Sequence, residues 1–410
     1  MNLDVNRMVL ARSMLVLGLA LGTSPLAAAP LPVEAWPTVD AAALAPAALL
    51  NGNGYTVDAK VPVLGYMGQF TMRAPAGVFA ADGTEMLAIR VAELAAIAEL
   101  SRMSQSSVFT EALAASAVKT GTAIGQAVLN PIGTLSGIPA GVGRFFTSAE
   151  TTISRATEAR GANSESSADA ANDLLGINKA KRRIAKQVGA DPYTTNPVLA
   201  KQLDDLARAA FAGGVSLDVA LTVSTAGVAT AVSATARVSD LVWERSPKDI
   251  RTAHEQKLAA MGVRAEAINA FVTNRWLTPT LSVPLVERLA ALPSGAGRSA
   301  VIELTSTVAS EGEARFMLNA VTMASRMNTT ADPIVAVDLA GRIMAIRTRG
   351  GRVNVPAPVD YIVWTESVRA FAAKESRRAG RTIVATGIAS PVAREGLTAA
   401  GWTVQERSAR

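Results

Sequence analysis

The side chains that carry most enzyme chemistry are nearly absent from this chain. Its 410 residues include no cysteine and a single histidine, His254. This composition excludes thiol nucleophiles, zinc sites built from Cys or from Cys and His, haem attachment through CxxCH, and two-histidine metal motifs. Charged neighbours surround His254 in the segment Arg251–Lys257, which predicts an exposed surface side chain rather than a catalytic base. We therefore predict no metal and no cofactor, and the composition argues against an enzyme.

Carboxylate catalysis needs neither histidine nor cysteine, so the acidic residues are the remaining source of chemistry. Paired acids occur at Asp204–Asp205 and at Glu311 with Glu313, but both pairs fit solvated helix faces. We find no convincing GxSxG, SxxK, HExxH, GxGxxG, P-loop or calcium-loop pattern. The sequence predicts no catalytic residue.

The best candidate for binding is a basic stripe followed by a turn. Four cations spaced at i, i+3, i+4 and i+7 share one side of a helix. They are Lys179, Arg182, Arg183 and Lys186. The turn is Asp191–Pro197, where Asp and Asn precede proline, and Tyr193 and Asn196 complete the candidate contact surface. Lipid headgroups or another polyanion fit the stripe. A solvated helix face and a simple connector between helices are the plainer interpretations.

A weaker candidate is an anion site at Thr386, Gly387 and Ser390, between a predicted strand and a predicted helix. Helix N-termini bind anions readily. An enzyme with its site here, using convergent acids or Lys374, is a further hypothesis. The plainer interpretation is that Ser390 caps the helix.

The elements that must position these residues fall into three parts. Residues 55–61 and 68–73 alternate between apolar and polar side chains, which predicts strands. The apolar periodicity over 85–328 predicts a long helical region. The pattern after residue 333 predicts an α/β unit. Its last part, Thr382–Gln405, reads as a strand–helix–strand unit with parallel strands. The N-terminal strands are expected to join the same sheet. The predicted class is α+β, mostly α. The predicted divisions are 1–29 (leader), 30–54 (Pro/Ala-rich lead-in), 55–84 (β), 85–330 (helical) and 331–410 (α/β).

Two weakly charged segments rich in small residues, 112–143 and 219–236, suggest an alternative in which they insert into a membrane as a hairpin. Prolines at 131 and 139 oppose a continuous helix in the first, and Thr and Ser dilute the second. The alternatives are a tight loop or a close helix crossing for the first segment and a buried central helix for the second.

The first 29 residues predict a secretory signal peptide. Arg7 and Arg12 precede an apolar run at 13–22, which is too short to span a bilayer, and Ala27–Ala29 resembles a cleavage site. Cleavage after Ala35 is the fallback, because Pro30 fits poorly after a cut. The formal net charge of +6 is spread along the chain without an Arg-rich, aromatic strip, which does not favour nucleic acid. We expect an exported, periplasmic or secreted bacterial protein that binds a protein partner or an anionic envelope surface, without catalysis.

Overall fold

The computed structural model describes residues 31–105, 142–146, 168–213, 240–293, 296–374 and 380–409. In this part of the chain it contains 13 helices and 13 strands in three sheets. The fold is therefore mixed α/β, and the predicted class, α+β and mostly α, is wrong. The physical reason is that several strands span only two or three residues, which is too short to show the alternation that marks a strand in sequence.

An antiparallel sheet forms near the N-terminus and follows the strand order β1-β4-β5-β3-β2, with β6 paired to β5. The strands are β1 (Thr38–Asp40), β2 (Asn51–Gly52), β3 (Tyr55–Val57), β4 (Lys60–Leu64), β5 (Met67–Ala74) and β6 (Gly77–Asp82). Two short helices precede β2, α1 (Ala41–Leu44) and α2 (Ala47–Leu50). The strand predicted at 68–73 is confirmed as part of β5, whereas the one predicted at 55–61 is divided between two short strands, β3 and β4. Residues 38–52, expected as a lead-in, instead contribute two strands and both short helices.

The helical elements follow this sheet in the sequence. They are α3 (Thr84–Ser104), the 3-10 turn η1 (Gly143–Phe146), α5 (Ala168–Gln187), α6 (Pro197–Gly213), α7 (Asp240–Glu244), α8 (Pro247–Ala260), α9 (Ala265–Thr273), α10 (Pro279–Ala290), α11 (Ala296–Thr305) and α12 (Glu311–Met327). Capping residues such as Ser246 and Ser310 accept backbone N–H bonds at the N-termini of α8 and α12.

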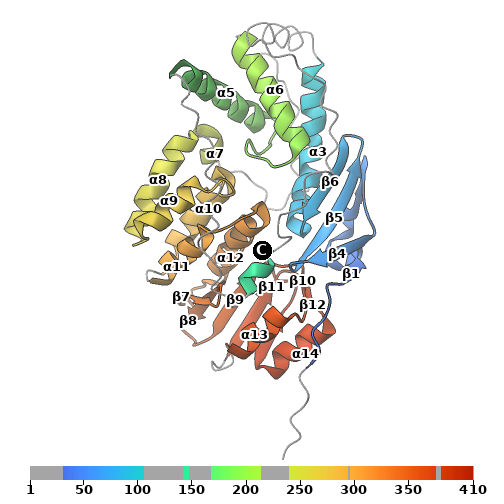
Figure 1. The fold of residues 1–410 in the computed structure, drawn as a ribbon, viewed down its shortest axis with the longest axis vertical. Helices are drawn as coiled ribbons and strands as arrows, with labels where there is room; N and C mark the ends of the chain where they lie inside the picture. Colours follow the sequence, from blue (N-terminus) through green and yellow to red (C-terminus); the bar gives the residue numbers. More distant parts are fainter. Residues whose placement is uncertain are drawn as a thin grey trace, which may run out of the picture. The chain divides into compact units, whose positions relative to one another are not determined.

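One hydrophobic core joins the N-terminal sheet to α3, α5 and α6. Phe70 and Met72 of the sheet, Leu100 of α3, Ile184 of α5 and Leu203 of α6 are all less than 2% exposed within it. In Figure 1, α3 lies beside the blue strands of this sheet. The helix α6 contacts α3, and α5 contacts α6. Burial of large apolar side chains is the main stabilising contribution here.

The C-terminal sheet has the order β13-β11-β9-β8-β7 and is separate from the N-terminal sheet, so the expectation of one shared sheet is wrong. Its strands are β7 (Ile334–Ala340), β8 (Ile343–Thr348), β9 (Val353–Ala357), β11 (Arg381–Ala385) and β13 (Trp402–Gln405). Two further strands, β10 (Tyr361–Ile362) and β12 (Ile388–Ala389), pair with each other, and the helices are α13 (Glu366–Lys374) and α14 (Pro391–Ala399). The predicted parallel strand–helix–strand unit is confirmed by β11, α14 and β13. The strand β9, between β8 and β11, was not predicted.

The carboxylate of Asp360, in the loop between β9 and β10, links the C-terminal unit to the N-terminal sheet and to α3. Asp360 is 3% exposed, and its Oδ2 accepts hydrogen bonds from the backbone N–H groups of Gly68 and Thr84, each at 3.0 Å. Gly83, the N-cap of α3, has φ 95° and no side chain that could cap the helix. Asp360 supplies that function from a distant part of the chain.

The single histidine is buried rather than exposed, so that prediction is wrong. His254 is 7% exposed and meets the ring of Phe271 edge-on at 6.0 Å. Burial lowers its pKa to about 4. Charged neighbours in sequence were misleading because they occupy the other faces of α8.

Val33–Arg410 form one unit, within which the predicted boundaries at 84 and 330 fall beside the start of α3 and between α12 and β7. The predicted leader 1–29 and the segment 219–236 lie outside the described residues, as does the segment 112–143 except for Val142 and Gly143. Among the helices that the structure does describe, none is both long and apolar enough to cross a membrane.

Candidate functional site

The turn between α5 and α6 is built by its own side chains. Asp191 Oδ1 accepts the N–H of Tyr193 at 2.8 Å, which closes the first half of the turn. Asn196 Oδ1 accepts the N–H of Val198 at 3.1 Å and caps α6, while Thr194 Oγ1 accepts the N–H of Asn196 at 3.0 Å. Local chemistry therefore explains why this sequence turns here and why α6 begins at Pro197.

Charged residues of α3 hold this turn from one side. Arg90 and Glu93 form a buried ion pair, with Arg90 Nη1 2.8 Å from Glu93 Oε2. Glu93 also accepts hydrogen bonds from Asn196 Nδ2, at 2.8 Å, and from the hydroxyl of Thr194. These bonds satisfy a carboxylate that burial alone would destabilise.

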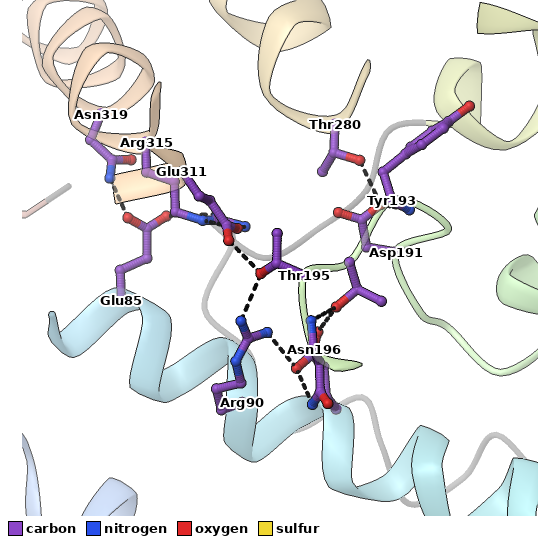
Figure 2. A network of polar contacts seen from close by, with 12 residues as sticks. Glu85, Arg90, Asp191, Tyr193, Thr195, Asn196, Thr280, Glu311, Arg315 and Asn319 are labelled. Carbon is purple, nitrogen blue, oxygen red and sulfur yellow. Dashed lines mark hydrogen bonds and ion pairs between the residues drawn. The ribbon is translucent and has the colours of Figure 1, made fainter. Parts of the chain in front are cut away.

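The N-terminus of α12 holds the turn from the other side. Arg315 lies 2.8 Å from Glu311 and 3.6 Å from Glu85 of α3, and Asn319 donates to Glu85. The hydroxyl of Thr195 joins the two sides, because it accepts from Arg90 Nη2 at 2.7 Å and donates to Glu311. Figure 2 shows this network converging on Thr195 from α3 and α12.

A pocket of about 330 Å³ opens beside the network. Its lining includes Asp191, Tyr193, Thr195, Arg275, Trp276 and Glu311. The two residues from the loop between α9 and α10 stack, with the Arg275 guanidinium carbon 4.4 Å from the centre of the Trp276 ring. Asn274 fixes this loop, since its amide donates to two backbone carbonyls and its oxygen accepts the N–H of Trp276 at 2.9 Å.

The two carboxyl groups of the pocket have opposite pKa shifts. Burial raises the pKa of Asp191, although Thr280 Oγ1 donates to it at 2.7 Å and the N–H of Tyr193 also donates. Burial alone would also raise the pKa of Glu311, but the Arg315 and Arg90 guanidiniums outweigh it and lower the pKa. The titration of Asp191 is therefore shifted towards higher pH, and that of Glu311 towards lower pH.

The network contains more carboxyl groups than guanidinium groups. Four carboxyl groups (Glu85, Glu93, Asp191 and Glu311) lie close to two guanidinium groups (Arg90 and Arg315). Glu85 and Glu311 pair with Arg315, and Glu93 pairs with Arg90. Asp191 forms no ion pair with any residue the structure describes, and its Oδ2 accepts no hydrogen bond from them.

The predicted binding residues are only partly brought together here. Tyr193 lines the pocket, and Asn196 is fully buried as the helix cap. Lys179, Arg183 and Lys186 are exposed on α5. Arg182 is 8% exposed and donates to the backbone oxygen of Trp243 at 3.2 Å, so the four cations do not form one solvated stripe.

The predicted anion site is occupied by structural contacts. Ser390 caps α14 by accepting the N–H of Ala393 at 2.9 Å and donates to Glu34. Thr386 donates to the oxygen of Val359 at 2.9 Å, and a Cβ on Gly387 would lie 1.9 Å from the oxygen of Asp360. A hollow of about 530 Å³ near this point is lined by residues of α14 alone. Its Arg394 is paired with Glu406 at 2.6 Å.

Sequence reasoning missed Arg90, Glu93, Glu311 and Arg315. The expectation that Glu311 and Glu313 lie on a solvated face is wrong, since the Glu311 side chain is 15% exposed and Glu313 is 2% exposed. The available signal was the occurrence of charged residues within the apolar face of α3, where Arg90 and Glu93 stand in a buried row that is otherwise mostly apolar.

No group of three or more His, Asp or Glu side chains that could hold a metal ion occurs within the described ranges. In comparisons with known proteins, the chain matches no family model, no curated protein and no solved structure.

Proposed function

We propose that this protein is a non-enzymatic binding protein of the cell envelope that takes a small polar ligand into the pocket beside the 191–196 turn. The observation that carries the proposal is Asp191. Its partly buried carboxyl group lines a pocket and has one oxygen that no described donor reaches. A carboxyl group removed from water without a cationic partner costs stability, so it is expected where a ligand completes its contacts.

The surroundings of the pocket support binding because contacts within the protein already hold several of its lining side chains in place. Thr195 and Glu311 are positioned by Arg90 and Arg315, and Trp276 is held by Asn274. Lining groups whose side chains are already ordered lose little conformational entropy on binding. The volume lies near the lower end of the roughly 300–1,000 Å³ range of small-molecule pockets.

Thermal melting with a panel of small molecules tests this proposal. The panel contains amino acids and dipeptides, neutral sugars, polyamines and small dicarboxylates. We expect at least one class to raise the melting temperature of the wild-type protein and to lose most of that effect in Asp191→Asn. Asp205→Asn is the matched control, because Asp205 lies on the surface of α6 and pairs only with Lys201. A panel without effect, or an equal effect in both variants, contradicts the proposal.

A second candidate is acid–base hydrolysis at the same pocket. The observation that favours it is the opposite direction of the two pKa shifts, raised for Asp191 and lowered for Glu311. A proton donor and a charged base or nucleophile facing one pocket are the minimum equipment of a glycoside hydrolase. Release of nitrophenol from nitrophenyl glycosides, abolished in Glu311→Gln and in Asp191→Asn, supports this candidate. Ligand binding without turnover supports the first.

Export remains part of the proposal. The described contacts of Glu34 support cleavage at Ala29 over the fallback after Ala35. Glu34 accepts the N–H of Trp364 at 2.7 Å and donates its own N–H to the Trp364 oxygen at 2.8 Å, and the fallback cut would remove it. N-terminal sequencing of protein from the periplasmic or culture fraction tests this. A mature chain beginning at Trp36, or one retaining the leader in the cytosol, contradicts it.

Membrane insertion by 112–143 and 219–236 remains the alternative to a freely diffusing binding protein. Washing isolated membranes with alkaline carbonate separates the two. A protein recovered in the soluble periplasmic fraction supports the binding proposal, and a protein that resists extraction supports insertion.

A further inference from the structure

The pocket contains one charge of each sign that the described part of the protein leaves without an ionic partner. The acidic group is the carboxyl of Asp191, whose Oδ2 accepts no hydrogen bond from the described residues. Arg275 is exposed and stacks on Trp276, but it forms no ion pair with any described residue. The other charged group of the lining, Glu311, is already bonded to Arg315 and Thr195. A carboxyl group and a guanidinium group are therefore both available to one ligand.

We propose that the ligand is a small zwitterion of the amino-acid type, a free α-amino acid or a short peptide, whose ammonium group contacts Asp191 and whose carboxylate contacts Arg275. This inference rests on the proposed function and names its ligand class. An ammonium group supplies the donor that Asp191 Oδ2 lacks, and a carboxylate matches the fork of a guanidinium group.

The remaining lining suits the rest of such a molecule. Trp276 and Leu281 offer apolar surface for a side chain, and Thr195 offers a hydroxyl. Stacking on Trp276 restricts the Arg275 side chain, so less rotamer freedom is lost when a carboxylate binds. The pocket is small, which favours a single residue or a dipeptide over a long peptide.

Ligands with one charge fit less well. A simple amine contacts Asp191 but leaves the guanidinium group of Arg275 without an anion, and a simple carboxylate contacts Arg275 but leaves Asp191 Oδ2 without a donor. Each therefore makes only one of the two charged contacts, and specificity is the resulting difference in affinity. The zwitterion alone satisfies both groups.

Isothermal titration calorimetry of the full mature chain tests the inference. The probes are the twenty standard L-amino acids and a set of dipeptides, each hit being compared with its decarboxylated and its deaminated analogue. We expect at least one zwitterion to bind, and each analogue to bind roughly 10- to 100-fold more weakly, the range for losing one hydrogen bond to a charged group.

Two variants assign the contacts. Asp191→Asn should weaken binding of the zwitterion but not of the deaminated analogue, and Arg275→Gln should weaken the zwitterion but not the decarboxylated analogue. Arg251→Gln, an exposed arginine of α8, is the control and should leave all affinities unchanged. Arg275 is exposed, so its variant is informative even if Asp191→Asn fails to fold.

The outcomes separate this inference from the proposed function. If a sugar, polyamine or dicarboxylate binds in a manner that depends on Asp191 and no zwitterion does, the zwitterion inference is wrong and the binding function stands. Equal affinity for a zwitterion and its analogues also overturns the inference. If no probe of any class binds, both are wrong.

Discussion

Replacing Asp360 should show how strongly the N-terminal sheet and α3 depend on the C-terminal unit. In Asp360→Ala the N–H groups of Gly68 and Thr84 lose the oxygen they share. Each buried donor left without an acceptor costs about 1–3 kcal/mol, so the free energy of unfolding should fall by about 2–6 kcal/mol. Asp360→Asn keeps one oxygen that can accept both bonds and should lose about 1–2 kcal/mol, through the charge that favours a helix N-terminus.

Urea unfolding followed by circular dichroism measures these differences. Hydrogen exchange locates them, because the amides of Gly68 and Thr84 should exchange faster in the alanine variant. Asp205→Ala is the matched control, since its carboxylate is half exposed and bonds only to Lys201. It should change the stability by less than about 1 kcal/mol. An alanine variant at position 360 within about 0.5 kcal/mol of wild type would refute the view that this carboxylate caps α3.

Three further outcomes are expected. The pKa of His254 is about 4 in the folded protein and 6.5 in the unfolded chain, so between these pH values mainly the unfolded state takes up a proton. The free energy of unfolding should therefore fall by about 3 kcal/mol between pH 7 and pH 4. Urea unfolding at pH 7 and pH 4.5 should show a smaller loss of this free energy in His254→Leu than in the wild type. Gly387→Ala should lower the melting temperature, because the new Cβ would lie 1.9 Å from a backbone oxygen, whereas Gly312→Ala, whose nearest neighbour is at 3.8 Å, should leave it unchanged or raised. Lys179→Ser with Arg183→Ser should reduce sedimentation with anionic vesicles if α5 contacts the envelope surface, and unchanged sedimentation would count against that contact.

Local elements were predictable because their signals are local. The start of α6 follows from Asn196 and Pro197, and the start of α14 follows from Ser390 and Pro391, since a capping oxygen and a proline act within one helical turn. The unit of β11, α14 and β13 was predicted for the same reason, together with its turn at Gly401. The strand β9 was missed because it is short and contains a proline, and its place in the sheet depends on partners on both sides.

The candidate site was less predictable, because a charged residue has the same appearance in sequence whether water or another side chain solvates it. The acids and bases that meet at Thr195 are separated by about a hundred residues or more along the chain, 105 from Arg90 and 116 to Glu311. The cap of α3 comes from a residue 276 positions away. Composition and periodicity establish which helices and strands can form, since these depend on neighbours three or four residues apart. Which charges are buried, which pair, and which are left for a ligand depends on how those elements pack, because burial is a property of the folded chain and not of any one segment.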